Sequence, residues 1–196
     1  MFSIIIPCHN YGKFLLKCLK SIEFENDYLK EVIILNDSSE DNTDEIIEKI
    51  VNKKKIVYYK VKFKSLAKTI NFGAKKVTTK YFSRIDPDDE YHPMFFEKIV
   101  NRMINKEYHF IYGDVIETKN SKAKYLKQKI NLYNQYIKHP LSNGTLIDSK
   151  NFINIGGISE NIKFKDDYDF WLKIVKAKSL IKYVNVPTFF YNKHDK

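Results

Sequence analysis

The sequence predicts an α/β fold with a mostly parallel central sheet and helices on both faces of that sheet. Short apolar runs alternate along the chain with segments whose apolar residues recur at helical spacing, an order typical of strand-helix-strand units. Polar turns follow several of the apolar runs, as expected where the strands of a parallel sheet end. Together these observations predict right-handed crossovers between neighbouring parallel strands.

The first half of the chain contains four expected strands joined by helices. Each expected strand is a short run rich in Ile, Val, Phe or Tyr, and each expected helix places its apolar residues on one face. The expected strands are residues 2–8, 31–37, 55–61 and 80–85. The expected helices are residues 11–22, a segment after the turn at 38–43, residues 65–76, and a helix that opens at Pro93, since proline is favoured in the first helical turn.

The second half of the chain is less regular. Residues 110–118 predict a further strand, and the basic, weakly periodic stretch 119–140 is expected to form a flap. Residues 144–158 predict a short strand, a helical turn and a Gly-Gly turn, and residues 165–177 predict an acidic turn that enters a helix. Residues 180–196 predict two short closing strands. This half is therefore expected to form a smaller subregion beside the main sheet.

The composition is that of one globular domain. The chain has 196 residues, of which 43% are hydrophobic and 15% aromatic, so it is too apolar to be disordered and long enough to bury a sizeable core. Its first apolar run is short and has no basic lead-in, which fits neither a signal peptide nor a membrane span, and we expect a cytoplasmic protein. Cys8 and Cys18 have no partner at zinc-site spacing and are expected to be reduced packing residues.

The charge of the chain predicts an anionic partner. The formal net charge is +10, which is compatible with nucleic acid, anionic lipid or phosphorylated small molecules. Residues 118–147 contain no Asp or Glu, and the basic stretch 119–140 is interpreted as a solvated flexible loop, with acceptor contact or peripheral membrane contact as the alternative. The acidic residues gather elsewhere, in the turns at 36–45, 86–90 and 166–169.

The acidic turn "DPDDE", residues 86–90, predicts a metal site. Asp86 and Asp88 lie one residue apart where a buried strand ends, so their carboxylates can supply oxygen ligands to Mg²⁺ or Mn²⁺. Such a cation would neutralise charge on a departing nucleotide, and the surrounding lysines would attract the same anionic substrate. The alternative is an ordinary acidic turn that precedes the helix from Pro93.

Five segments in order resemble one known family. They are "SIIIPCHNYGKFLLKCLKSI", "EVIILNDSSEDNT", "SLAKTINFGAKKVTTKYFSRIDPDDEYHP", "IGGISENIKFKDDYDFWLKI" and "YNKH", and together they resemble the family 2 glycosyltransferases of the GT-A fold over nearly the whole chain. The resemblance implies a single glycosyltransferase domain, residues 1–196, with a nucleotide-sugar-binding half at 1–118 and an acceptor-side half at 119–196. It implies inverting transfer from a nucleotide-diphosphate sugar, typically a UDP-sugar, to a glycan or other hydroxyl acceptor. A divalent metal and a role in bacterial surface or capsular polysaccharide synthesis, at or near the inner face of the membrane, are also implied.

The resemblance assigns roles to single residues at the donor and the metal. Asp37 matches the carboxylate that hydrogen-bonds the base, and Asp86 and Asp88 match the family's DxD motif, in which the second Asp ligates the metal. The donor-binding residues that it implies are Pro7, Asn10, Asp37, Asn71 and Asp86. The metal-binding residues that it implies are Asp88, Asp86 and His194, the last from the closing "Y-x-x-H".

The catalytic base is expected in the segment "KDDYDFW". Asp166 and Asp167 match an acidic pair that supplies the family's general base, and Asp167 is the expected base itself. A carboxylate at this place would take the proton of the acceptor hydroxyl as its oxygen attacks the anomeric carbon. Gly156 and Gly157 match a turn before this motif and are expected to have a structural role.

Two other functions compete with this interpretation. A metal-dependent nucleotidyltransferase would also use paired acids and an α/β sheet, but the first turn, "PCHNYGK", holds only Gly12 where a glycine-rich phosphate loop is expected. A basic nucleic-acid-binding module would use the lysines and tyrosines of 119–140, including Tyr125, Tyr133 and Tyr136. Acidic clusters at the expected ligand rim disfavour this module, because they repel phosphates, and nucleic acid is not expected as a partner.

Overall fold

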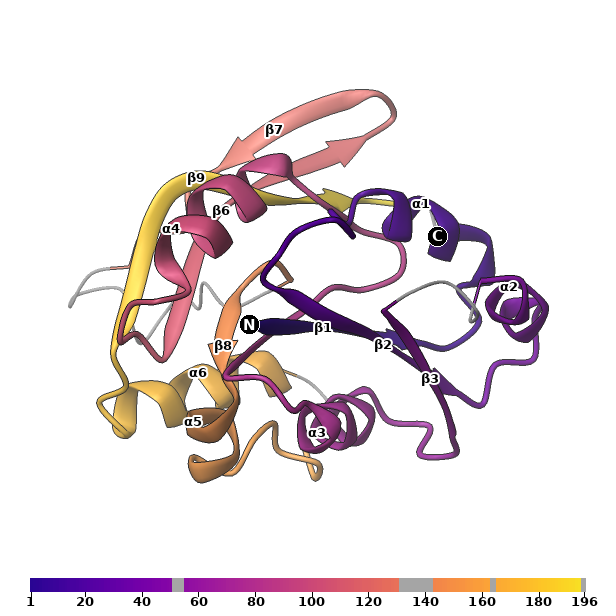
Figure 1. Ribbon diagram of the computed structural model, residues 1–196, viewed down its shortest axis with the longest axis horizontal. Helices are drawn as coiled ribbons and strands as arrows, with labels where there is room; N and C mark the ends of the chain where they lie inside the picture. Colours follow the sequence, from indigo (N-terminus) through magenta and orange to yellow (C-terminus); the bar gives the residue numbers. More distant parts are fainter. Residues whose placement is uncertain (51–54, 131–142, 163–164, 195–196) are drawn as a thin grey trace.

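The computed structural model describes residues 1–50, 55–130, 143–162 and 165–194, and Figure 1 shows their arrangement. Within these residues the strands form one nine-stranded sheet in the order β3-β2-β1-β4-β8-β6-β9-β5, with β7 paired to β6. The strands are β1 Phe2–Cys8, β2 Leu29–Asp37, β3 Ile56–Val61, β4 Tyr81–Arg84, β5 Glu90–Tyr91, β6 Phe110–Lys119, β7 Lys122–Leu126, β8 Leu146–Asp148 and β9 Ile181–Asn192. The helices are α1 Gly12–Lys20, α2 Thr43–Glu48, α3 Leu66–Lys76, the π-helical η1 Phe95–Val100, α4 Asn101–Met103, α5 Ser149–Asn154 and α6 Asp166–Lys176.

The first four long strands form the expected parallel part of the sheet. β1 pairs with β2 and with β4, and β2 pairs with β3, all in parallel. Every residue of β1 is buried, because successive side chains point to opposite faces and helices cover both. Figure 1 shows α1, α2 and α4 on one side of these strands and α3, α5 and α6 on the other. The predicted α/β fold with helices on both faces is confirmed.

Two apolar cores lie on the two faces of the sheet. Phe2, Ile4 and Ile6 pack in the core that includes α1 and η1, and Ile5 packs in the core that includes α3 and α6. Gly73 brings α3 close to the sheet, because a Cβ atom at this position would lie 2.7 Å from a methyl carbon of Leu35. A larger residue would push α3 away from β1 and β2, whose carboxyl ends carry the candidate site.

The second part of the sheet is mostly antiparallel, which the sequence did not predict. β8 lies antiparallel between β4 and β6, and β5 is antiparallel to β9, while β6 and β9 are parallel. The prediction of two short closing strands is wrong, because β9 is one strand of twelve residues. Its register against β6 shifts on both sides of Asp114, which lies opposite Pro187. A proline has no backbone N–H to donate, so it is tolerated at such an irregularity without ending the strand.

The stretch 119–140 is partly an ordered hairpin and not wholly a flap. β7 pairs antiparallel with the end of β6, and Asn120 and Ser121 form the turn with φ angles of 48° and 62°. Two positive φ angles in a two-residue loop match the right-handed twist of the paired strands. Residues 131–140, including Tyr133 and Tyr136, lie outside the described residues, so the flap prediction is not tested there.

Two smaller predictions can be compared with the structure. Cys8 and Cys18 are buried free thiols, and burial raises the pKa of Cys8 to about 11, as expected of packing residues. The helix from Pro93 is present and includes the π-helical stretch η1. Among the described helices, none is long and apolar enough to cross a membrane.

Candidate functional site

The loops after β1 and β2 meet at one rim of the sheet, as the parallel topology predicts. Asn10 links the two loops. Its side-chain oxygen accepts from the Glu40 N–H at 2.7 Å, and its backbone N–H donates to Ser39 Oγ at 2.9 Å. Asn10 adopts a φ of 59°, which asparagine tolerates better than most residues. The Asp41 carboxylate accepts from the Gly12 N–H at 3.0 Å and so holds the start of α1 at the same rim.

A pocket of about 220 Å³ opens between these two loops and the start of α3. Pro7, His9 and Asp37 line it from the ends of β1 and β2, and Lys64 lines it from the loop before α3. His9 Nδ1 lies 2.6 Å from the backbone oxygen of Asp37, so the two strand ends are joined directly. The structure thus brings together Pro7 and Asp37, two predicted donor-binding residues, in what we call the base pocket, and places Asn10 beside them.

The Asp37 carboxylate holds the loop that closes the base pocket. It accepts hydrogen bonds from the backbone N–H groups of Phe63 at 2.7 Å, Lys64 at 2.8 Å and Ser65 at 3.0 Å, and from the Thr69 hydroxyl at 2.8 Å. Burial alone would raise the pKa of Asp37, but these hydrogen bonds outweigh burial and lower it. Asp37 is therefore an ionised anchor of the 63–65 loop, and its predicted contact with a base is additional to this role.

Asn71 lies away from the base pocket, against the Gly-Gly turn. Its amide nitrogen donates to the backbone oxygen of Ile158 at 2.8 Å, and its carbonyl oxygen accepts from the Ile158 N–H at 3.0 Å. A Cβ atom on Gly157 would lie 2.6 Å from that carbonyl oxygen. Asn71 therefore positions the turn that precedes α6, which supports the structural role predicted for Gly157, and its role in donor binding stays a prediction.

The four carboxylates of the acidic turn, residues 86–90, point to four different partners. The Arg84 guanidinium binds Asp86 through both carboxylate oxygens, with distances of 2.8 Å and 2.9 Å from Nη2. Glu90 forms an ion pair with Lys17 of α1 at 2.6 Å. The cluster is therefore divided by its neighbours into separate sites.

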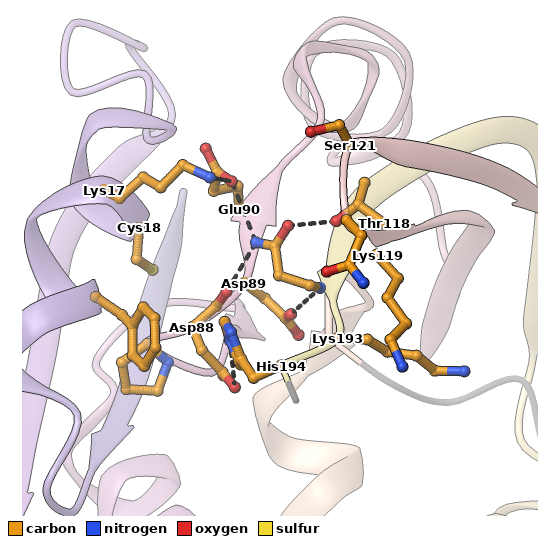
Figure 2. A pocket seen from close by; sticks show the side chains of 14 residues that line it. Lys17, Cys18, Asp88, Asp89, Glu90, Thr118, Lys119, Ser121, Lys193 and His194 are labelled. Carbon is orange, nitrogen blue, oxygen red and sulfur yellow. Dashed lines mark hydrogen bonds and ion pairs between the residues drawn. The ribbon is translucent and has the colours of Figure 1, made fainter. Parts of the chain in front are cut away.

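Asp88 lies opposite His194, as the two predicted metal ligands should. Asp88 Oδ2 is 3.5 Å from His194 Nε2, and the His194 ring packs at a tilt against Phe14 of α1, with 4.4 Å between ring centroids. Burial raises the pKa of Asp88, and the charge of Asp86 raises it further. Figure 2 shows both side chains in a pocket of about 260 Å³, which we call the Asp88 pocket.

These two residues fit a divalent metal as a partial ligand set. Carboxylate oxygen and imidazole nitrogen are both ligands of Mn²⁺, and Mg²⁺ accepts the carboxylate. Among the described residues, no group of three or more His, Cys, Asp or Glu side chains is placed to hold a metal ion. The protein would therefore supply Asp88 and His194, while Asp86 is engaged by Arg84.

Asp89 and Asn192 hold the end of β9 against the acidic turn, and the sequence analysis missed Asn192. Asp89 is only 2% exposed and accepts from the Asn192 N–H at 3.0 Å and from the Asn143 side chain. The Asn192 amide donates to the Asp88 backbone oxygen at 2.8 Å. Burial raises the pKa of Asp89 to about 7. These bonds place His194, two residues further on, beside Asp88.

A cleft of about 370 Å³ brings the acidic turn and α6 together. Its lining includes Arg84 and Asp86 from the end of β4 and the acidic turn, Glu117 of β6 and Asp167 of α6. Asp167 is exposed in the first turn of α6, where its Oδ1 accepts from the Tyr168 N–H at 2.8 Å. Asp166 precedes it and is partly buried. The Asp167 carboxylate is therefore solvent-exposed and lines the same cleft as Asp86.

The chain is similar to proteins of one family. Residues 3–161 match the sequence profile of Glycosyl transferase family 2. An uncharacterized glycosyltransferase from Rickettsia typhi is 29% identical over 193 residues, covering 92% of this chain and 60% of that protein. One from Rickettsia prowazekii is 30% identical over 193 residues, again covering 92% and 60%. The chain thus spans about 60% of the length of these relatives.

Solved structures of S. aureus TarS have a similar fold. TarS 1-349 in complex with UDP-GlcNAc gives a TM-score of 0.81 at 18% identity, with 100% of this chain and 59% of that chain covered. TarS 1-349 in complex with UDP gives 0.75 at 17% identity, with 98% and 60% covered. At a sequence identity below 20%, this structural similarity is evidence for the fold alone.

Proposed function

The chain belongs to glycosyl transferase family 2 and has the GT-A fold, and on this premise we propose that it transfers a sugar from a UDP-sugar or related nucleotide-sugar donor to a hydroxyl acceptor. The proposal includes inversion at the anomeric carbon and assistance by Mn²⁺ or Mg²⁺. It also includes a place in bacterial surface polysaccharide synthesis, with a glycan as the acceptor. The TarS complexes with UDP-GlcNAc and UDP support a nucleotide-sugar donor.

The observation that supports this proposal is that three hollows contain the predicted base-binding, metal-binding and catalytic residues. The base pocket at Asp37, the Asp88 pocket and the cleft with Asp167 lie at the ends of β2, β4 and the start of α6. A nucleotide sugar needs three such environments, for the base, the diphosphate and the reacting sugar. The +10 net charge favours approach of such an anionic donor.

Asp88 and His194 would hold the metal, and the two-oxygen contact with Arg84 holds the Asp86 carboxylate in place beside it. When bound, the cation would neutralise charge that develops on the departing diphosphate. Asp167 would accept the proton of the acceptor hydroxyl, because its carboxylate is exposed to the cleft that Asp86 lines. The acceptor oxygen would then attack the anomeric carbon from the side opposite the leaving nucleotide, which inverts the configuration.

A thermal-shift screen of nucleotide sugars with and without Mn²⁺ tests the donor and the metal together. A ligand at about 100 times its Kd stabilises the native state by about 2.7 kcal/mol, which raises Tm by about 5–10 °C in a domain of this size. We expect UDP-sugars to give such a shift with Mn²⁺, Asp88→Ala to lose it and Asp167→Asn to keep it. Glu40→Gln, an exposed carboxylate of the same rim, is the matched control and should behave as the wild type.

Transfer is then measured by mass spectrometry with glycan acceptors. Intact sugar on the acceptor and free UDP support the proposal, whereas release of pyrophosphate identifies a nucleotidyltransferase. Asp167→Asn should bind the donor and transfer poorly, since the proton acceptor is lost. Full transfer by both Asp88→Ala and Asp167→Asn contradicts the assigned roles.

A further inference from the structure

The β6–β7 hairpin carries its lysines on one face. Its register pairs Lys119 with Lys122, Glu117 with Lys124 and Val115 with Leu126. Residues directly opposite in an antiparallel pair lie on the same face, and so do residues two apart along a strand. Three lysines, Lys119, Lys122 and Lys124, therefore share one face of the hairpin, which we call the basic face. All three are exposed.

The basic face continues two of the hollows already described. Val115, Glu117 and Leu126, on this face of the hairpin, line the cleft that contains Asp86 and Asp167. A second hollow on the hairpin shares Glu117 with the cleft and is otherwise lined by the three lysines, Asn120 and Ala123. Residues at the tip of the hairpin also line the Asp88 pocket. Figure 2 shows Thr118, Lys119 and Ser121 across that pocket from Lys17 and Cys18.

The charge of this face is strongly positive. Glu117, its one acidic residue among the described residues 115–126, forms an ion pair with Lys193 at 2.8 Å, so its charge is already compensated. Within the part of the chain that the structure describes, no carboxylate forms an ion pair with Lys122 or Lys124. Lysines two residues apart along a strand are separated by about 7 Å, a spacing that suits successive charges of a polymer. Their ammonium groups bind phosphate or carboxylate as point charges, without demanding one geometry.

We propose that the basic face binds the anionic part of an extended acceptor, whose phosphate or carboxylate groups lie beyond the hydroxyl that enters the cleft. This inference rests on the proposed glycosyl transfer and adds the chemical class of the acceptor to it. An acceptor chain that leaves the cleft past Glu117 meets Lys124, Lys122 and Lys119. Anionic groups on that chain would gain attraction from these positive charges, and a neutral chain would not.

Binding of a defined anionic polymer tests the proposal. Fluorescently labelled inorganic polyphosphate is titrated against the full chain by anisotropy over a series of salt concentrations. We expect Lys122→Glu/Lys124→Glu to weaken binding by about tenfold or more and to reduce the slope of log K against log salt by about two. The matched control is Lys30→Glu/Lys75→Glu, which makes the same change in net charge at exposed positions of β2 and α3 and should change binding less than about twofold.

Further measurements separate the sources of anionic charge and the two proposals. Vesicles of phosphatidylcholine with and without phosphatidylglycerol are titrated in parallel. If the hairpin and control variants lose polyphosphate binding equally, the inference is wrong. It is also wrong if the hairpin variant loses only vesicle binding, because the basic face would then be a membrane contact. The UDP-sugar thermal shift should be unchanged in the hairpin variant, because its lysines lie outside the base pocket. If no nucleotide sugar shifts the Tm of the wild type, the proposed function is contradicted. That measurement contains no polyphosphate, so it is independent of the test of the basic face.

Discussion

Replacement of Asp37 by Asn tests whether one carboxylate builds the base pocket. The carboxylate is 4% exposed and accepts four hydrogen bonds, from the backbone of residues 63–65 and from Thr69. Asparagine keeps one acceptor oxygen, which can serve Phe63 and Lys64, and turns an NH₂ group toward the others. The Thr69 hydroxyl can rotate to accept from that group, because it also lies 2.9 Å from the Ser65 backbone oxygen. The Ser65 N–H then has no acceptor.

The expected loss of stability follows from this count. A buried donor left without an acceptor costs about 1–3 kcal/mol, and the remaining bonds lose the strengthening that a charged acceptor gives them. We therefore expect Asp37→Asn to lower the free energy of unfolding by about 2–4 kcal/mol, measured by urea denaturation at neutral pH. Asp41→Asn is the control: it removes an exposed carboxylate that caps backbone N–H groups at the same rim but does not line the base pocket.

The two variants should separate stability from binding. Asp37→Asn should also weaken UDP binding, because the 63–65 loop closes the base pocket, whereas Asp41→Asn should bind UDP as the wild type does. If Asp37→Asn unfolds within about 0.5 kcal/mol of the wild type, the carboxylate does not hold this loop and the reasoning is wrong.

Three further predictions follow from single contacts. The stability difference between the wild type and Asp37→Asn should be constant above about pH 5 and shrink in acid, because a lowered native pKa gives stability that is lost as the pH falls through it. Gly157→Ala should lower the free energy of unfolding by about 1–3 kcal/mol more than Gly156→Ala does, as measured by thermal unfolding. Both glycines have a positive φ, but only a Cβ atom at 157 would meet Asn71. Asn192→Ala should lower the free energy of unfolding by about 1–3 kcal/mol and weaken the binding of Mn²⁺ in the presence of UDP, measured by calorimetry. The control Asn185→Ala, at an exposed position, should change neither quantity.

The parallel half of the fold was predictable because each strand carries its own signal. β1, β2 and β4 are short runs that the sheet buries almost completely, and the helices between them have one apolar face. β7 has no such signal: its residues are exposed, and its extended form depends on pairing with β6. The single strand β9 was predicted as two short strands, because the irregular register that accommodates Pro187 depends on its partner strand β6.

Motif and resemblance singled out positions for the candidate site, but they could not give the contacts that those residues make. Asp37, Asp88, Asp167 and His194 were singled out by motif and resemblance, and the structure places them along one rim. The tie between Asp89 and Asn192 joins residues 103 positions apart, and no local pattern marks Asn192 as its partner. The Arg84 pairing with Asp86 had a local signal, since the two residues are two apart at the end of a strand, but a charge count alone does not show their geometry.

The acidic turn can exist in a basic chain because each carboxylate has a different kind of partner, and this also indicates where a cation would bind. Asp86 holds a guanidinium through both oxygens and Glu90 holds an ammonium, so a metal at either would displace a fixed positive charge. Asp89 is buried and its oxygens accept from amide groups that hold β9 in place. Asp88 meets an imidazole, which is itself a metal ligand. Under the proposed function, a divalent cation would bind between these two groups and replace only the contact that they make with each other.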